Sequence, residues 1–398
     1  MKATAHPTPL VHIILDGFDA CYLRSAPFLA KHIGQGGARP MVIPSPFGVR
    51  GMIFSGTLPA QNKDFTDLWR DSDTSRLRFL HFLFKSSQPL SHHNRWLIKL
   101  IVRLLSGEPC RIPKHLPTRY LPFFDSPRVA RRFSSFKDKG SPPTLIDHLR
   151  DNRIPFQYFG PPFTSFWSKP LSQLAQAIKP KSKYVLAHVV TPDIYGHQFG
   201  PKADKTEALI QEIDSQIQLL CKNIRSQFPH AALIIHSDHG MSQVKNSIDF
   251  ESKIKQWPLT AGIDFDYFLD STMARFWLLN RDKHEMLIEW IQKDLVESKL
   301  LDDHSLKKYG MAGLDPRFGD FFAIVPEGTI ISPNFYQAKP VNGMHGYGVE
   351  SSRGILAWSG ISPHETIQKE ISLVDIYPTV TSLLGITPHP NTVGNPIF

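Results

Sequence analysis

The sequence predicts an α/β fold, a doubly wound and mostly parallel sheet, from two observations. Short apolar runs of strand length alternate with stretches of helical periodicity along most of the chain. Several of these runs end directly in Asp, His or Gly, as buried parallel strands do at the carboxyl edge of a sheet. The chain has 398 residues, 41% hydrophobic and 20% charged, which is enough for one large domain over residues 1–398 with a packed core.

The elements follow in an order that supports this fold. Residues 10–15 form an apolar run that ends in Asp16-Gly17, and they predict a buried parallel strand with a functional residue at its end. A helix at 26–33 and a short strand at 41–43 follow. We expect further strands at 156–159, 184–190, 231–236, 268–280, 321–325 and 354–358, and helices at 144–150, 207–227, 285–298 and 374–384.

Ser45-Pro46 predicts the start of another helix, which would run to Ser55 and end at Gly56. Serine suits the N-cap, and proline suits the first helical position because its missing N–H would have no partner there. A serine at a helix start also faces free backbone N–H groups, which favour a bound phosphate. An ordinary cap is the alternative interpretation.

Residues 69–140 carry the positive charge of the chain. They contain fifteen Lys and Arg residues against five Asp and Glu residues, and the whole chain has a net charge of +9. The segment interrupts the strand–helix order, so we expect a basic, largely helical insertion that acts as a cap. Residues 242–342 are expected to form a small α+β subdomain within the same domain.

The basic charge has two interpretations: a solvated face, or attraction of an anionic substrate or surface. No recognised motif indicates specific nucleic-acid binding. Within the basic segment, residues 95–105 form a basic amphipathic helix. Such helices can lie on membranes, but more often they pack their apolar face on the parent domain, which is what we expect here.

Several features limit where the protein acts. Cys21, Cys110 and Cys221 are too few and too scattered for a disulfide framework, and none lies in a Cys-x-x-Cys pair of a thiolate zinc site. The first nine residues lack the apolar stretch of a signal peptide. No apolar run approaches the roughly 18 residues that a membrane span needs. We therefore expect a cytoplasmic protein without a transmembrane segment.

Six Asp and His residues, both types that bind metals, lie beside predicted strand ends or glycines. Asp193 and His197 lie four apart and share one face if Pro192 starts a helical turn. Asp238 and His239 follow a predicted strand, where the chain turns and both can reach one ion. The others are Asp16 and, between two glycines, His345. Carboxylates and imidazoles without cysteine favour zinc over manganese or magnesium.

These motifs resemble the alkaline phosphatase superfamily, in particular its nucleotide pyrophosphatase/phosphodiesterase branch. The resemblance is carried, in the family's order, by residues 14–17, 55–59, 191–201, 237–241 and 344–347, with 317–320 and 374–379 as further elements. It implies an alkaline phosphatase-like fold and a phosphoric ester hydrolase with two Zn²⁺ ions, other divalent metals being possible.

The resemblance also implies roles for single residues. One zinc would be held by Asp193, His197 and His345, and the second by Asp16, Asp238 and His239. When the family's motif is aligned from Gly56 backwards without a gap, the nucleophile position falls on Pro46. A one-residue gap in this alignment moves that position to Ser45, which would be both nucleophile and metal ligand. Asn62 would contact the phosphate. The implied mechanism is in-line attack by Ser45 through a covalent phospho-enzyme intermediate.

Alternatives remain within and outside this class. A phosphomonoesterase needs extra positive charge at the site, which the basic insertion could supply. A sulfatase is not indicated, since no cysteine has a Cys-x-Pro-x-Arg context. If Ser45 is not the nucleophile, the protein is a hydrolase that uses water or a degenerate, non-catalytic metal-binding member. The expected partner is an anionic phosphate-containing small molecule or lipid head group, and the sequence leaves the oligomeric state open.

Overall fold

The computed structural model describes residues 8–33, 37–73, 75–78, 88–106, 111–125, 142–160, 171–361 and 370–398. Its central sheet has seven strands in the order β17-β2-β16-β7-β1-β6-β5. Strands β7, β1, β6 and β5 are parallel, whereas β16 is antiparallel to both of its neighbours. The predicted doubly wound, mostly parallel sheet is confirmed. The bounds are β17 Ile371–Ser372, β2 Arg39–Val42, β16 Arg353–Ser359, β7 Ala232–Ser237, β1 Leu10–Leu15, β6 Tyr184–Val189 and β5 Phe156–Phe159.

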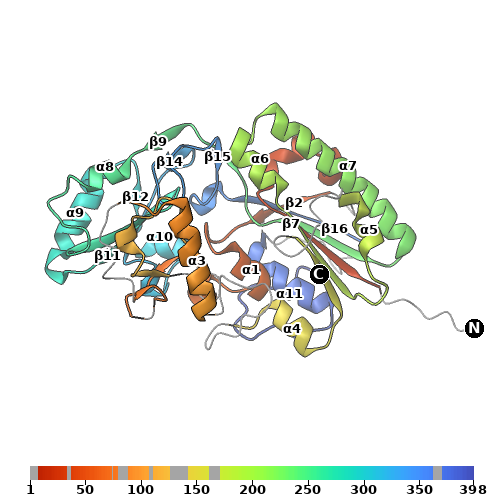
Figure 1. Cartoon of the computed structure of the whole chain (residues 1–398). Helices are drawn as coiled ribbons and strands as arrows, with labels where there is room; N and C mark the ends of the chain where they lie inside the picture. The colour runs from red at the N-terminus through yellow and green to blue at the C-terminus, as the bar shows by residue number, and fades with distance from the viewer. Residues whose placement is uncertain are drawn as a thin grey trace, which may run out of the picture.

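Helices cover both faces of this sheet (Figure 1). All six residues of β1 are buried, and successive side chains point to opposite faces. Val11, Ile13 and Leu15 belong to the apolar cluster under α5 (Leu174–Ala177) and α7 (Asp204–Gln227). Leu10 and Ile14 belong to the cluster under α1 (Val49–Ser55), α4 (Leu145–Asp151) and α11 (Ile376–Leu383). A strand buried on both faces explains why residues 10–15 are almost continuously apolar.

A second, antiparallel sheet lies beside the first and has the order β10-β11-β13-β12. We expected a single strand over 268–280, which is wrong. The chain turns at Asp270, whose N–H donates to Met273 O at 2.9 Å, because Asp and Ser favour turns. The elements are α8 Phe250–Ile254, β10 Phe265–Leu269, β11 Met273–Leu278, α9 His284–Asp294, β12 Lys299–Leu300, α10 Asp303–Lys308 and β13 Phe321–Ile324.

Three short strand pairs lie outside these two sheets. Strand β8 (Ser242–Gln243) pairs with β15 (Gly343–Met344), β9 (Asn246–Ile248) with β14 (Thr329–Ile331), and β3 (Trp69–Arg70) with β4 (Phe124–Asp125). The second sheet and strands β8, β9 and β14 lie within segment 242–342, whose assignment as a subdomain stays a prediction.

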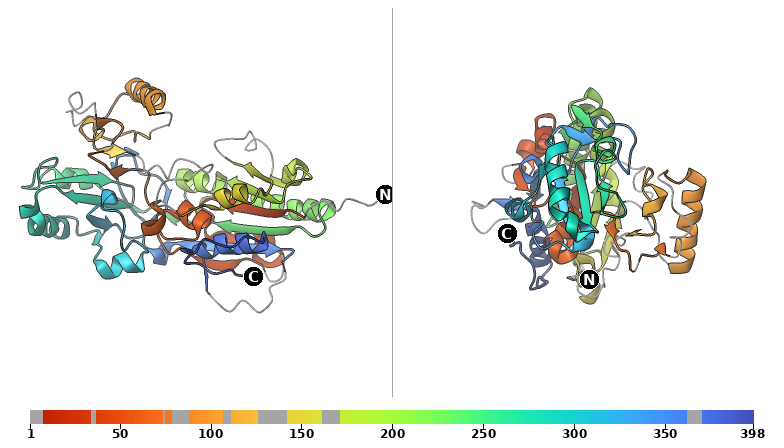
Figure 2. Two further views of the ribbon diagram at one scale, coloured as in Figure 1. Left: turned by 90° about the horizontal axis from the view of Figure 1, so that it is seen from below. Right: turned by 90° about the vertical axis from the view of Figure 1, so that its left-hand side faces the viewer.

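The described part of the basic insertion packs on the second sheet. Tyr120 contacts Tyr267 with ring centroids 5.8 Å apart, and Arg70 Nε pairs with Asp266 Oδ2 at 2.8 Å. Helix α3 (His92–Ser106) stands out from the body of the molecule (Figure 2). Residues 74, 79–87, 107–110 and 126–140 of this insertion lie outside the described residues, and its role as a cap stays a prediction.

Helix α3 does not bury its apolar face as we expected. Of its described apolar side chains, only Ile98 and Val102 are buried in the core of the second sheet. Trp96, Leu97, Leu100, Ile101 and Leu104 are all exposed. No helix among the described residues is long and apolar enough to cross a membrane.

The predicted helix start at Ser45 is also wrong. Helix α1 begins at Val49, and its N-cap is Gly48, in the left-handed region with φ 73°. Asp64 takes the capping role, because its Oδ2 accepts a hydrogen bond from Gly51 N at 2.7 Å. A side chain on Gly48 would collide with the carbonyl of Asp64. Helix α2 (Pro59–Asn62) links α1 to this capping aspartate.

Candidate metal centre

The register of the central sheet brings three chain segments to one edge. Leu15, the last residue of β1, lies opposite Val189 of β6 and Ser237 of β7. Asp16 and Asp238 follow directly at this edge, and helix α6 (Thr191–Phe199) begins two residues after β6. Parallel strands therefore place all three segments at their carboxyl ends, where α/β proteins bind ligands.

The first cluster contains Asp193, His197 and His345. Asp193 and His197 lie one turn apart on α6, as the sequence predicted, and His197 Nε2 is 3.2 Å from Asp193 Oδ1. His345 Nε2 lies 3.6 Å from the same oxygen. His345 follows β15, which α6 anchors through His197 Nδ1 and the carbonyl of Gly343 at 2.8 Å.

The second cluster contains Asp16, Asp238 and His239. His239 Nε2 is 3.3 Å from Asp16 Oδ1 and 3.7 Å from Asp238 Oδ2. Gly17 N donates to Asp238 Oδ1 at 3.1 Å, which fixes that carboxylate beside Asp16. The His239 ring stacks on His345 with centroids 3.6 Å apart. The two clusters therefore form one continuous site, and all six predicted ligand residues meet there.

The donor atoms fit divalent metal ions. Within the described part of the chain, the buried Oδ1 of Asp193 makes no hydrogen bond, although two imidazole nitrogens face it. His197 and His239 direct Nδ1 to the carbonyls of Gly343 and Gly240, which leaves Nε2 free to coordinate. Carboxylate and imidazole donors suit zinc.

His188 joins the site although the sequence did not predict it there. It lies on β6 and is buried, and its Nε2 is 2.8 Å from Asp16 Oδ2. Donor atoms of Asp16, His188 and Asp238 all lie within 4.8 Å of one another, as do those of Asp193, His239 and His345. The sequence signal that could have indicated His188 was its position: a histidine in a predicted buried strand, just before the Thr191-Pro192 motif.

The proximity of these groups shifts their pKa values. Burial and the charge of Asp16 raise the pKa of Asp238 to about 6. Burial opposes the charged form of His239, but Asp238 and Asp16 outweigh it and raise the pKa to about 10. Burial and the neighbouring His239 hold the pKa of His345 well below its usual value. The metal-free site therefore keeps a proton on His239 at neutral pH.

Ser45 lies in the loop between β2 and α1, beside Gly310. Its hydroxyl is fully buried and has no hydrogen-bond partner among the described residues. Phe47, two residues on, has a ring carbon 3.0 Å from where a Cβ on Gly346 would stand, so the Ser45 loop contacts the turn that holds His345. None of the described hydrogen bonds or ion pairs joins Ser45 to the six ligand residues, and its role as nucleophile stays a prediction.

Asn62 has a structural role. Its Nδ2 donates to Thr57 O at 2.8 Å, and its Oδ1 accepts from Asp64 N at 2.8 Å. The buried side chain therefore holds the loop that places the capping carboxylate on α1. Contact with a phosphate stays a prediction for this residue.

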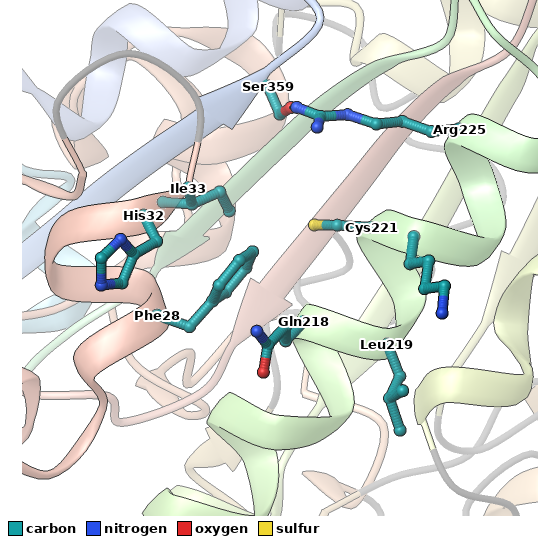
Figure 3. Close-up of a pocket in the computed structure, with 9 residues that line it drawn as sticks. Phe28, His32, Ile33, Gln218, Leu219, Cys221, Arg225 and Ser359 are labelled. Atoms are coloured by element: carbon teal, nitrogen blue, oxygen red, sulfur yellow. The ribbon is translucent and has the colours of Figure 1, made fainter.

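A separate pocket of about 550 Å³ lies between α7 and the single-turn helix η2 (Phe28–His32) (Figure 3). Cys221, Lys222 and Arg225 of α7 line it together with Phe28 and His32. It shares no residue with the two Asp/His clusters, so it is distinct from the candidate metal centre.

Comparison with known proteins identifies the family of this chain. A family model described as type I phosphodiesterase/nucleotide pyrophosphatase matches residues 116–348. The chain is 28% identical over 215 residues to bis(5'-adenosyl)-triphosphatase ENPP4 of Bos taurus and 26% identical to that of Homo sapiens. Each match covers 50% of this chain and 44% of the relative, so it spans less than half the length of these curated relatives.

Solved structures share the fold. Murine ectonucleotide pyrophosphatase/phosphodiesterase 5, in an inactive form in complex with AMP, is similar with a TM-score of 0.64 and 15% identity over 96% of both chains. The human protein of that name is similar with a TM-score of 0.64 and 16% identity over 98% of this chain and 97% of that one. Because the family model matches more than half of the chain, this protein belongs to the type I phosphodiesterase/nucleotide pyrophosphatase family.

Proposed function

We propose that this protein is a metal-dependent phosphodiesterase or nucleotide pyrophosphatase that takes two zinc ions. The observation that carries the proposal is that the two Asp/His clusters meet at the stacked rings of His239, which faces Asp16, and His345, which faces Asp193. Asp193, His197 and His345 would hold one ion, and Asp16, Asp238 and His239 the other. The similarity to bis(5'-adenosyl)-triphosphatases favours a nucleotide substrate with a phosphoric anhydride or diester.

The proposed reaction uses Ser45 as nucleophile. When bound, a zinc pair supplies positive charge that stabilises the phosphoryl group and favours an ionised hydroxyl. Ser45 Oγ, having lost its proton to solvent, forms a bond to phosphorus while the bond to the leaving oxygen breaks and that oxygen departs on the leaving group. Water then breaks the bond between Oγ and phosphorus, which restores the serine hydroxyl and releases the phosphoryl group as a phosphate product. The contact of Phe47 with the turn that holds His345 supports this choice of loop. Asn62 supports the helix that follows.

The proposal is tested with the full chain loaded with zinc. We expect it to hydrolyse bis(p-nitrophenyl) phosphate faster than p-nitrophenyl phosphate and p-nitrophenyl sulfate. Ser45→Ala should abolish turnover but keep the metal, whereas Ser382→Ala on the surface of α11 should change neither. A preference for the monoester would replace the proposal with a phosphomonoesterase. Unchanged turnover in Ser45→Ala would remove Ser45 from the mechanism and leave water as the nucleophile.

Two observations favour a second candidate function, a degenerate, non-catalytic metal-binding member of the family that binds phosphate. Pro46 stands at the position that counting back from Gly56 gives to the nucleophile, and the hydroxyl of Ser45 is buried without a described partner. In that case the metal-loaded chain would bind AMP, as measured by isothermal titration calorimetry, and turn over none of the three chromogenic esters.

A further inference from the structure

The apolar face of α3 remains on the surface of the folded protein. Trp96 and Leu104 are 56% and 75% exposed, although Trp and Leu are usually buried. At about 100° per residue, the exposed apolar side chains form one continuous stripe about 140° wide along the helix. The stripe consists of Trp96, Leu97, Leu100, Ile101 and Leu104. A contiguous exposed apolar surface of this kind marks an interaction site.

The opposite side of the same helix attaches it to the protein. Ile98 and Val102 are buried in the core of the second sheet, and Arg95 Nη1 donates to the carbonyl of Lys114 at 3.1 Å. The exposed stripe is therefore presented by an anchored helix, and Figure 2 shows that α3 projects from the body of the molecule.

The charges beside the stripe select one kind of partner. Lys99 and Arg103 flank it, and α3 contains no Asp or Glu. The insertion that carries α3 has an excess of ten positive charges over residues 69–140, as its fifteen basic and five acidic residues give. An anionic surface would be attracted to this helix, and an apolar layer beneath that surface would accept the stripe.

We propose that α3 is an interfacial helix that docks the protein on membranes containing anionic lipids. The exposed Trp96 suits the boundary between head groups and acyl chains, where tryptophan is enriched. At 1.5 Å per residue the 15-residue helix is about 22 Å long, so it lies in the plane of the interface and does not cross the bilayer. This inference is independent of the proposed hydrolytic activity, because it involves none of the residues of the metal centre.

The test is co-sedimentation of the full chain with vesicles of phosphatidylcholine containing 30% phosphatidylserine, beside vesicles of phosphatidylcholine alone. We expect binding to the anionic vesicles, and its loss in 0.5 M NaCl. Trp96→Ser with Leu104→Ser should lower the partition coefficient by about tenfold for each residue, given the transfer energy of such side chains. Lys99→Gln with Arg103→Gln should weaken binding to the phosphatidylserine vesicles by about fivefold for each residue and leave binding to phosphatidylcholine alone unchanged.

A matched control tests whether vesicle binding depends on α3 or on exposed apolar side chains in general. Ile263 and Val296 are 67% and 69% exposed in segment 242–342, and Ile263→Ser with Val296→Ser should bind vesicles like the parent chain. Circular dichroism checks that each variant is folded. The proposal would be overturned if the intact chain did not bind anionic vesicles, or if the variant with Trp96→Ser and Leu104→Ser bound them equally well. It would also be overturned if the intact chain bound no vesicles but self-associated in sedimentation velocity, and the same variant did not self-associate. This last result would assign the stripe to a second copy of the chain.

Discussion

Replacing His188 with Leu is predicted to weaken zinc binding without removing a proposed ligand. His188 is buried and its Nε2 lies 2.8 Å from Asp16 Oδ2. Because a carboxylate only accepts hydrogen bonds, Nε2 carries the proton between them. This bond leaves Asp16 Oδ1 to face His239 at 3.3 Å, so His188 orients the oxygen that we assign to the metal.

The expected magnitude follows from that bond. A hydrogen bond to a charged group is worth about 1.5–3 kcal/mol, which corresponds to about 10- to 150-fold in a dissociation constant. Losing a group that orients a metal ligand costs a similar factor, about 10- to 100-fold. His188→Leu should therefore weaken zinc binding by this factor, whereas His188→Gln, which keeps an N–H donor, should lose much less.

The assay is competition for zinc between the folded chain and a chromogenic chelator, with thermal unfolding of the metal-free variants measured in parallel. Equal zinc affinity in His188→Leu and the parent chain would refute the orienting role. Complete loss of one ion in both variants would instead make His188 a direct ligand, consistent with its position near Asp16 and Asp238.

Three further predictions concern the same site and its support. Because the pKa of His239 is raised to about 10, zinc must displace a proton from this residue at neutral pH. Zinc binding should therefore release about one proton, and its affinity should fall about tenfold for each unit by which the pH is lowered between pH 9 and 7. Calorimetry in buffers of different ionisation enthalpy measures the proton release, and a pH-independent affinity would contradict the prediction. Asn62→Ala should lower the free energy of unfolding in urea by about 1–3 kcal/mol, because it leaves buried backbone groups unpaired. The control is Asn391→Ala, which changes an exposed residue and should have little effect. Equal unfolding curves for the two variants would show that Asn62 does not stabilise its loop. Gly346→Ala places a Cβ on a residue with φ 81°, 3.0 Å from the Phe47 ring, so this variant should bind less metal beside His345. Gly385→Ala is the control, because Gly385 has φ 68° but open space around it, and it should keep the metal content of the parent chain. Equal metal content in both variants would show that the turn at Gly346 is not constrained.

Much of the fold could be predicted because strand ends and ligands coincide in this chain. The apolar run at 10–15 is buried on both faces and leads directly to Asp16, so strand position and site position carry the same signal. Pro192 fixed the start of α6 and therefore the shared face of Asp193 and His197. Such local signals are readable without tertiary information.

The errors arose where distant residues decide local structure. The carboxylate of Asp64 caps α1 through Gly51 N. The start of α1 is therefore set by a residue later in the chain, not by Ser45-Pro46 as we predicted. The hairpin at Asp270 was hidden because apolar residues continue on both sides of its turn. His188 gave no motif of its own, since its role depends on the register between β6 and β1. The exposure of α3 depends on how the basic insertion packs on the second sheet.

We propose that this protein binds two metal ions at adjacent sites, which are built from Asp16, Asp193, His197, Asp238, His239 and His345. The most direct measurement is elemental analysis of the zinc-loaded chain after gel filtration, beside Asp193→Asn and Asp238→Asn. We predict about two zinc ions per parent chain, as in two-metal hydrolases, and about one in each variant, with the fold retained. One ion or none in the folded parent chain, or the same metal content in all three proteins, would rule out two adjacent metal sites built from these residues.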